Sequence, residues 1–339
     1  MKTPISILSW GVVSPGGTGV DSLERPEAWP YTLVSEIADP ARNHPVSSVD
    51  LEKDPINRWR LRPRLRRASP ISHYMMEAAA QALESHPEID RTRLGIVSAS
   101  FLGCLLYSVR FYRQFQKEGR RFASPALFPE TVANSPLSHL VSELKIGGPV
   151  YSQIGDKSCW SNALRTAACW LFNEDAEHVL VIGAEEFEAH ALDAFRSARW
   201  LNKPFSVPFS HGAGAVLLGL DPSRSHPRIC TLEDGFSFRT VTECRAAAQQ
   251  CLTHFDNQTP VYDSATGWIG KIAAEAIGTR TTLTDLPNLK QEALTASCAW
   301  DTIRTANYLR SHPDRAITLP FWGLSQGIGA ALISGATFR

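Results

Sequence analysis

Along the first two thirds of the chain, the hydrophobic and polar positions form two kinds of pattern that follow each other in turn. Short apolar runs, which are typical of strands, occur at Ile5–Val13, Arg93–Ala99, Val150–Ile154 and His178–Gly183. Longer stretches with helical spacing lie between them and predict helices over Ser72–Leu83, Leu102–Gln116, Thr131–Leu144 and Cys159–Phe172. The unbroken Val-Leu-Val-Ile run at 179–182 indicates a strand covered on both faces. This order of elements predicts an α/β fold.

A segment that contains Pro and Ser, Asp221–Pro227, interrupts this order. Beyond it the pattern starts again. It predicts strands at Arg228–Leu232, Pro260–Ser264, Ala316–Phe321 and Ala330–Ser334, with helices over Thr240–Leu252, Gly270–Ala276 and Gln291–Leu309. We therefore expect two similar αβ halves, residues 1–222 and a shorter half, residues 223–339.

Composition and charge exclude several classes of partner. Hydrophobic residues make up 43% and charged residues 20% of the 339 positions, which is typical of a folded, soluble protein. Lys+Arg and Asp+Glu both number 34, so net charge attracts the chain neither to nucleic acid nor to an anionic membrane. The apolar stretch Ile5–Val13 ends in a Ser-Pro-Gly-Gly turn without a cleavage site, and no later run is long enough to span a membrane. We expect a cytoplasmic location.

The seven cysteines are odd in number and include no Cys-x-x-Cys pair, which predicts reduced thiols packed as small hydrophobic groups. They are Cys104, Cys159, Cys169, Cys230, Cys244, Cys251 and Cys298.

Several segments, taken in order, resemble the β-ketoacyl synthases, which have the thiolase-like fold. They are Ile5–Gly17, with its Ser-Pro turn, Ser124–Pro136, Gly148-Pro149 with Ala163, the strand end Val181–Glu185 and the glycine-rich Trp322–Leu332. The order and spacing of these pieces are more specific than any one of them. The resemblance implies two similar αβ halves stacked in five layers, α-β-α-β-α.

The family's reactive cysteine stands on an elbow between a strand and a helix, where backbone N–H groups lower the pKa of its thiol. Counted from Gly148-Pro149, the matching position here is Lys157, which cannot form an acyl thioester. Cys159 follows two residues later and would point roughly 200° away around the helix. We expect Cys159 to be a packed thiol.

The resemblance also places two histidines in the second half, and neither is present here. The expected positions hold Phe255, ahead of Thr259–Asp263, and Glu292, ahead of a helix start rich in small residues. His254 would replace the first histidine if the register shifted by one residue. A carboxylate at 292 would repel the enolate that decarboxylation produces, whereas imidazole would stabilise it.

The closing glycine-rich turn resembles the one whose backbone N–H groups serve the family's oxyanion, with Leu324 in place of the gating phenylalanine. Gly327-Ile328-Gly329 does not complete a dinucleotide-binding pattern, because Leu332 stands at its sixth position. We expect no cofactor and no metal.

The loss of all three positions resembles the chain length factors, which are inactive relatives that pair with an active ketosynthase and shape its acyl tunnel. These relatives commonly carry Gln at the elbow, and Lys157 departs from that. The Asp156-Lys157 pair and the short chain resemble members from aryl-polyene-type pigment pathways more than those of bacterial type II polyketide synthases. Polyketide or fatty-acid-type biosynthesis is the implied context. Two alternatives remain: an active condensing or hydrolytic enzyme that uses Cys159 and His254, and a homodimeric module that binds a carrier protein.

Two segments are candidate contact surfaces. Arg58–Arg67 carries six arginines in ten positions and would either dock the acidic acyl carrier protein or form a solvated loop. The segment Phe101–Phe111 matches the region that closes the partner's acyl tunnel in ketosynthase dimers, and ordinary core packing is the alternative. Its tunnel-facing candidates are Phe101, Leu102, Leu105 and Tyr107, to which the resemblance adds Leu324.

Overall fold

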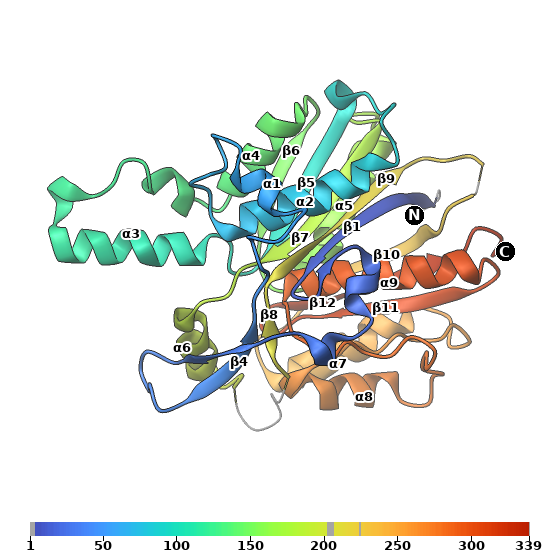
Figure 1. Cartoon of the computed structure of the whole chain (residues 1–339). Coiled ribbons are helices and arrows are strands. Elements are labelled where there is room, and N and C mark those ends of the chain that lie inside the picture. Colours follow the sequence, from blue (N-terminus) through green and yellow to red (C-terminus); the bar gives the residue numbers. More distant parts are fainter. Residues whose placement is uncertain (1–3, 202–206, 224, 339) are drawn as a thin grey trace.

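The computed structural model describes residues 4–201, 207–223 and 225–338. It contains one large sheet with the strand order β11-β12-β10-β1-β9-β7-β5-β6, and helices cover its faces (Figure 1). A second, three-stranded sheet has the order β3-β4-β8, from Thr32–Ser35, Asn43–Ser47 and Phe209–Ser210. The alternation predicted from the sequence is therefore confirmed as a mixed α/β architecture.

The first half of the sheet is made by β1 (Ile5–Ser14), β9 (Gly212–Gly219), β7 (His178–Glu185), β5 (Leu94–Ser100) and β6 (Val150–Ile154). β5 pairs parallel to both β6 and β7, and β9 pairs antiparallel to β7 and β1. The short β2 (Gly17–Thr18) folds back on β1. Helices α1 (Asn57–Arg60), α2 (Pro70–Glu84), α3 (Leu105–Glu118), α4 (Ser135–Leu144), α5 (Cys159–Phe172) and α6 (Ala189–Ser197) belong to this half.

The second half repeats this strand pairing with fewer residues. It contains β10 (Arg228–Ser237), α7 (Val241–Thr253), α8 (Gly270–Ile277), α9 (Thr295–Ser311), β11 (Ala316–Trp322) and β12 (Gly327–Ser334). β12 pairs antiparallel to β10 and β11, as β9 does to β1 and β7. Val261 then bridges parallel to Thr318 in β11 and to Thr282, in the places that β5 and β6 occupy in the first half. β1 pairs with β10 and joins the halves, which we propose divide between residues 222 and 223.

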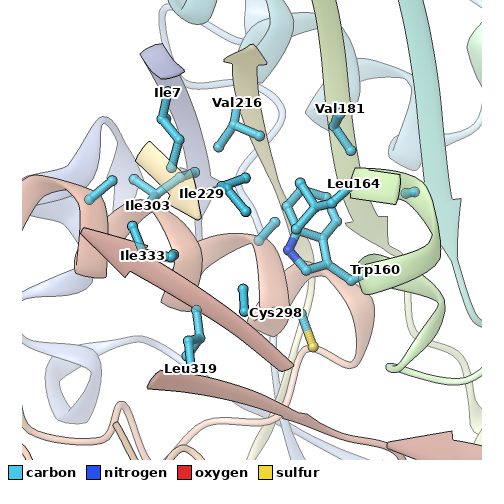
Figure 2. Packing of buried hydrophobic residues seen from close by; sticks show 14 of the residues in the cluster. Ile7, Trp160, Leu164, Val181, Val216, Ile229, Cys298, Ile303, Leu319 and Ile333 are labelled. Carbon is cyan, nitrogen blue, oxygen red and sulfur yellow. The ribbon is translucent and has the colours of Figure 1, made fainter. Parts of the chain in front are cut away.

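Helices and sheet halves stack in five layers. α2 and α4 pack on the outer face of the first half, and α7 and α8 pack on the outer face of the second. α5 and α9 lie between the two halves of the sheet and bury the largest apolar cluster against both. Figure 2 shows this central layer, with side chains of α5 and α9 among strand residues of both halves: Trp160, Leu164, Cys298, Ile303, Val181, Val216, Leu319 and Ile333. The five-layered, thiolase-like arrangement is confirmed.

Two glycines bring the start of α9 close to the sheet. A Cβ on Gly183 of β7 would lie 2.7 Å from the carbonyl oxygen of Thr295, and one on Gly214 of β9 would lie 2.8 Å from Cβ of Ala299. Any side chain at these positions would push the helix away. The residues just before α9 are thus held against the carboxyl end of β7.

Not every predicted element forms as expected. The strand predicted over Pro260–Ser264 is wrong, because it shrinks to the single bridged residue Val261. Pro260 has no N–H to donate, and after Tyr262 the chain turns as the Asp263 carboxylate accepts the N–H of Ala265 at 3.0 Å. The helix predicted from Gln291 starts only at Thr295, since Leu294 adopts a φ of 49°.

Candidate functional site

A lysine and a glutamate from the two halves form a buried ion pair. Lys157 lies in the turn between β6 and α5, and Glu292 lies just before α9, the corresponding helix of the second half. Nζ of Lys157 is 2.9 Å from Oε2 of Glu292, and both residues are almost completely shielded from solvent. Burial is the largest single influence and disfavours the ammonium, but the charge and hydrogen bond of Glu292, together with other acidic groups nearby, hold the pKa of Lys157 above its ordinary value. The elbow therefore carries a paired cation.

The neighbours of Glu292 fix its carboxylate in place. The hydroxyl of Thr266 donates to Oε2, and the N–H of Leu294 donates to Oε1 at 2.7 Å. The backbone of Glu292 is also tied to the segment 208–210, because its N–H donates to Pro208 at 2.9 Å and its carbonyl accepts from Ser210 at 2.9 Å. Both oxygens of the Glu292 carboxylate therefore have hydrogen-bond donors, and Oε2 also contacts the ammonium.

Asp156, the residue before Lys157, is completely buried and accepts hydrogen bonds from four backbone N–H groups. Its Oδ1 accepts from Lys157 at 2.7 Å and from Leu324 at 2.8 Å. Its Oδ2 accepts from Ser325 at 2.7 Å and from Gln326 at 2.9 Å. The carboxylate thus ties the elbow of the first half to the glycine-rich turn of the second.

Two consecutive glutamates at the end of β7 hold the surrounding loops. Glu185 accepts N–H groups of Phe101 at 2.6 Å, Leu102 at 3.0 Å and Thr295 at 3.3 Å, so it links the segment before α3 to the start of α9. Burial raises the pKa of Glu185 to about 7.

Glu186 also accepts backbone N–H groups, from the starts of two helices. It accepts the N–H groups of Ile71 at 3.1 Å and Leu106 at 3.2 Å, in the first turns of α2 and α3. Burial raises its pKa to about 8.

The alternative nucleophile and base are not brought together by any described contact. Cys159 is 7% exposed, its Sγ donates to the carbonyl of Gly155 at 3.6 Å, and burial raises the pKa of its thiol. His254 is largely exposed at the end of α7, where its Nδ1 lies 3.2 Å from Glu233. A buried thiol with a raised pKa is a poor nucleophile.

The other predicted site residues fall into two groups. Leu324 is buried and reaches the site through its backbone N–H. Phe255, by contrast, is buried in the outer cluster with α7 and α8, whereas the side chain of Thr266 contacts Glu292.

The segment before and within α3 is half-buried. The ring of Phe101 lies 6.0 Å from those of Phe195 and Trp200, and Leu102 and Leu105 border the same aromatic cluster. The ring of Tyr107 faces the guanidinium of Arg110 at 5.0 Å. Within the arginine-rich segment, Arg58 pairs with Glu77 at 2.9 Å, and Arg60 pairs with Glu52.

Sequence reasoning missed Asp156, Thr266 and Glu185. Asp156 had a visible signal, since a carboxylate next to Lys157 on a buried elbow needs donors of its own. Thr266 was hidden by the assignment of the first histidine position to Phe255. Within residues 4–201, 207–223 and 225–338, no group of His, Cys, Asp and Glu is placed to hold a metal ion, and no helix is long and apolar enough to cross a membrane.

No known family description and no curated protein matches the sequence. Solved structures match over nearly the whole chain. The ishigamide ketosynthase/chain length factor superposes with a TM-score of 0.81 at 17% identity, covering 97% of this chain and 99% of that one. The ketosynthase ApeO in complex with its chain length factor ApeC from Xenorhabdus doucetiae superposes with a TM-score of 0.71 at 14% identity, covering 98% of this chain and 98% of that one.

A type II polyketide ketosynthase bound to the hexaketide, in complex with its acyl carrier protein (AntDE:AntF), gives a TM-score of 0.77 at 16% identity and covers 99% of this chain and 100% of that one. The likeness establishes that the chain has the fold of ketosynthases and chain length factors.

Proposed function

We propose that this chain, built on the ketosynthase fold, is a non-catalytic subunit of the chain length factor type. It would pair with an active ketosynthase and shape the acyl tunnel of that partner, in polyketide, aryl polyene or fatty-acid-type biosynthesis. An acyl carrier protein would be a further, weak partner, and Arg58–Arg67 is the surface proposed for it. The proposed location is the cytoplasm, where such pathways find their carrier-bound substrates.

The buried ion pair of Lys157 with Glu292 carries this proposal. Acyl transfer needs a nucleophile with a free electron pair, and an ammonium paired at 2.9 Å with a carboxylate has none. A carboxylate at 292 also places negative charge where decarboxylation would build up more of it. Both features oppose the two steps of condensation.

Two observations support pairing with a second subunit. β6 is the last strand of the large sheet in the described residues, and Val150, Tyr151 and Ile154 on it are exposed. α3 and the following loop extend away from the body of the molecule (Figure 1), and they expose the aromatic rings of Tyr112, Phe115, Phe122 and Phe128. A free strand edge with apolar side chains pairs readily with another chain.

The test is acylation. Incubated with acyl- and malonyl-carrier protein, the chain alone should keep its unmodified mass and release no carbon dioxide, as followed by intact-mass spectrometry and a decarboxylation assay. The variant Cys159→Ser separates the alternative enzyme from the proposed subunit. An acyl adduct on the original chain that disappears in Cys159→Ser would establish the alternative and end the proposal.

A further inference from the structure

The carboxylate of Asp156 occupies a cradle of backbone donors that is suited to an anion. Three successive N–H groups, at 324 to 326, point at it together with the N–H of Lys157. The cradle lies at the start of the 14-residue helix α5, whose dipole also favours negative charge. Such converging N–H groups bind carboxylates, and they equally stabilise a carbonyl oxygen that gains charge during a reaction.

The glycine-rich turn closes tightly around this carboxylate. A Cβ on Gly323 would lie 2.5 Å from Oδ2 of Asp156 and 1.9 Å from the carbonyl oxygen of Gly327. Only glycine allows the turn to approach so closely. The N–H of Asp156 in turn donates to Oε1 of Gln326, with N and Oε1 3.5 Å apart. The cradle is therefore shaped around a resident oxygen pair, and Asp156 itself is completely shielded from solvent.

The position of Oδ1 shows which hydrogen-bond donors the Asp156 carboxylate withholds from any other group. It receives the N–H of residue 157 and that of Leu324, so it lies beside the residue whose side chain forms the elbow. If a nucleophile at 157 attacked a thioester, the oxygen of the tetrahedral intermediate would need these two donors. Asp156 already holds both.

We infer that Asp156 is a built-in occupant of an oxyanion cradle and closes this subunit to acyl thioesters independently of the missing nucleophile. The inference rests on the proposed non-catalytic function and adds a second, separate block to it. A nucleophile restored at 157 therefore stays idle while Asp156 is present.

The experiment compares two matched variants. The parent is Lys157→Cys/Glu292→Gln/Cys159→Ser, in which the glutamine avoids an unpaired buried carboxylate and the serine removes the neighbouring thiol. The second adds Asp156→Ala. Each is treated with S-hexanoyl-N-acetylcysteamine: the new thiol attacks the carbonyl carbon, a carbon–sulfur bond forms, and N-acetylcysteamine leaves as a thiol that carries the proton lost by the attacking group.

We expect acylation, followed by intact mass and peptide mapping, to be on the order of 10²-fold faster with Asp156→Ala, since a single oxyanion donor contributes that much. Formate should refill the vacated cradle and slow this reaction, and neutral formamide should not. Equal rates in two folded variants, or indifference to formate, would overturn the inference and leave the proposed function intact. Acylation of the unmodified chain would instead refute the function.

A second measurement needs no nucleophile and only one substitution, so it does not depend on the folding of variants that carry three or four substitutions. Asp156→Ala alone should have a lower melting temperature than the unmodified chain, and formate should raise it in a concentration-dependent way while formamide leaves it unchanged. The unmodified chain, with its cradle filled, should show no such dependence. A melting temperature of Asp156→Ala that ignores formate would contradict an anion cradle.

Discussion

Burying the charge of Lys157 or of Glu292 alone would destabilise the folded chain, and the pairing of the two charges offsets much of that cost. Removing one partner of a buried pair leaves an uncompensated charge, whereas removing both is often close to neutral. We expect Lys157→Met to lower the free energy of unfolding by about 3–5 kcal/mol, and Lys157→Met/Glu292→Gln to recover most of it. Urea unfolding of the two variants measures the difference.

A surface pair serves as the control for that cycle. Nε of Arg245 lies 2.9 Å from Glu275, and both side chains are more than 40% exposed. Arg245→Ala should cost only about 0–1 kcal/mol. A Lys157→Met variant no less stable than Arg245→Ala would mean that the central pair contributes nothing to the fold.

Glu185 and Glu186 give stability a dependence on pH. Their pKa values in the folded chain are raised to about 7 and about 8 from an ordinary value of 4.5, so the folded chain binds more protons between these limits. The free energy of unfolding should therefore fall as the pH rises from about 5 to about 8. Glu186→Gln should flatten this decline, measured by thermal unfolding across the range.

The exposed Glu27→Gln is the matched control and should leave the slope unchanged. An unmodified chain whose stability rises from pH 5 to pH 8 would contradict the assignment.

At this scale the sequence singled out Lys157 and Glu292 separately, from an elbow and from a helix start, and did not predict that the two residues pair. Asp156 was missed as a ligand of the turn at 324–326, because that contact joins residues far apart in the chain. Phe255 was assigned from the residues that follow it, and spacing along the chain does not fix depth in the fold.

Among the elements, α3 and the segment before it are the ones expected to act on a partner. Leu102 and Tyr107 are half-buried, and the backbone of Leu102 is anchored by Glu185. If they close the partner's tunnel, Leu102→Ala/Tyr107→Ala should open space for further methylenes, each stabilised by about 0.8 kcal/mol when buried. Products of the reconstituted pair should become longer, as read by mass spectrometry of the carrier-bound chains.

Val109→Ala on the same helix is the control, since Val109 is its buried residue. That change should lower stability without altering product length. A fully assembled complex of the double variant with unchanged products would remove Leu102 and Tyr107 from the tunnel.

Elements with strong local patterns were predicted almost to the residue. β6 and α5 have the bounds expected from the sequence, because an apolar strand and an amphipathic helix flank a sharp turn there. The sheet β3-β4-β8 was not predicted, since its strands are short and β3 exposes Leu33. The strand at Pro260–Ser264 failed because its pairing depends on neighbours in the fold.

On the scale of the whole molecule, the free edge of β6 and the projecting α3 are expected to meet an active ketosynthase. Obligate interfaces bury about 2,000 Å² or more and have apolar centres. Tyr151→Lys/Ile154→Lys would put two charges into that centre and should weaken the heterodimer at least about tenfold, the factor that 1.4 kcal/mol represents. Co-expression followed by size-exclusion chromatography with light scattering reports the complex.

Leu220→Lys provides the comparison, because Leu220 is an exposed apolar residue that directly follows β9, and β7 and β5 separate β9 from β6. Its complex should form normally. A double variant of β6 that binds its ketosynthase as well as the unmodified chain would place the interface elsewhere.

The open edge of β6 also has a consequence for how the protein is made. A strand that awaits its partner offers the same backbone groups to any other extended chain, including copies of itself, so every molecule synthesised in excess is a template for aggregation. The relative dosage of the two chains would then decide how much of this one survives. Balanced production, from adjacent reading frames or by folding beside the partner, would protect it without any change in its sequence.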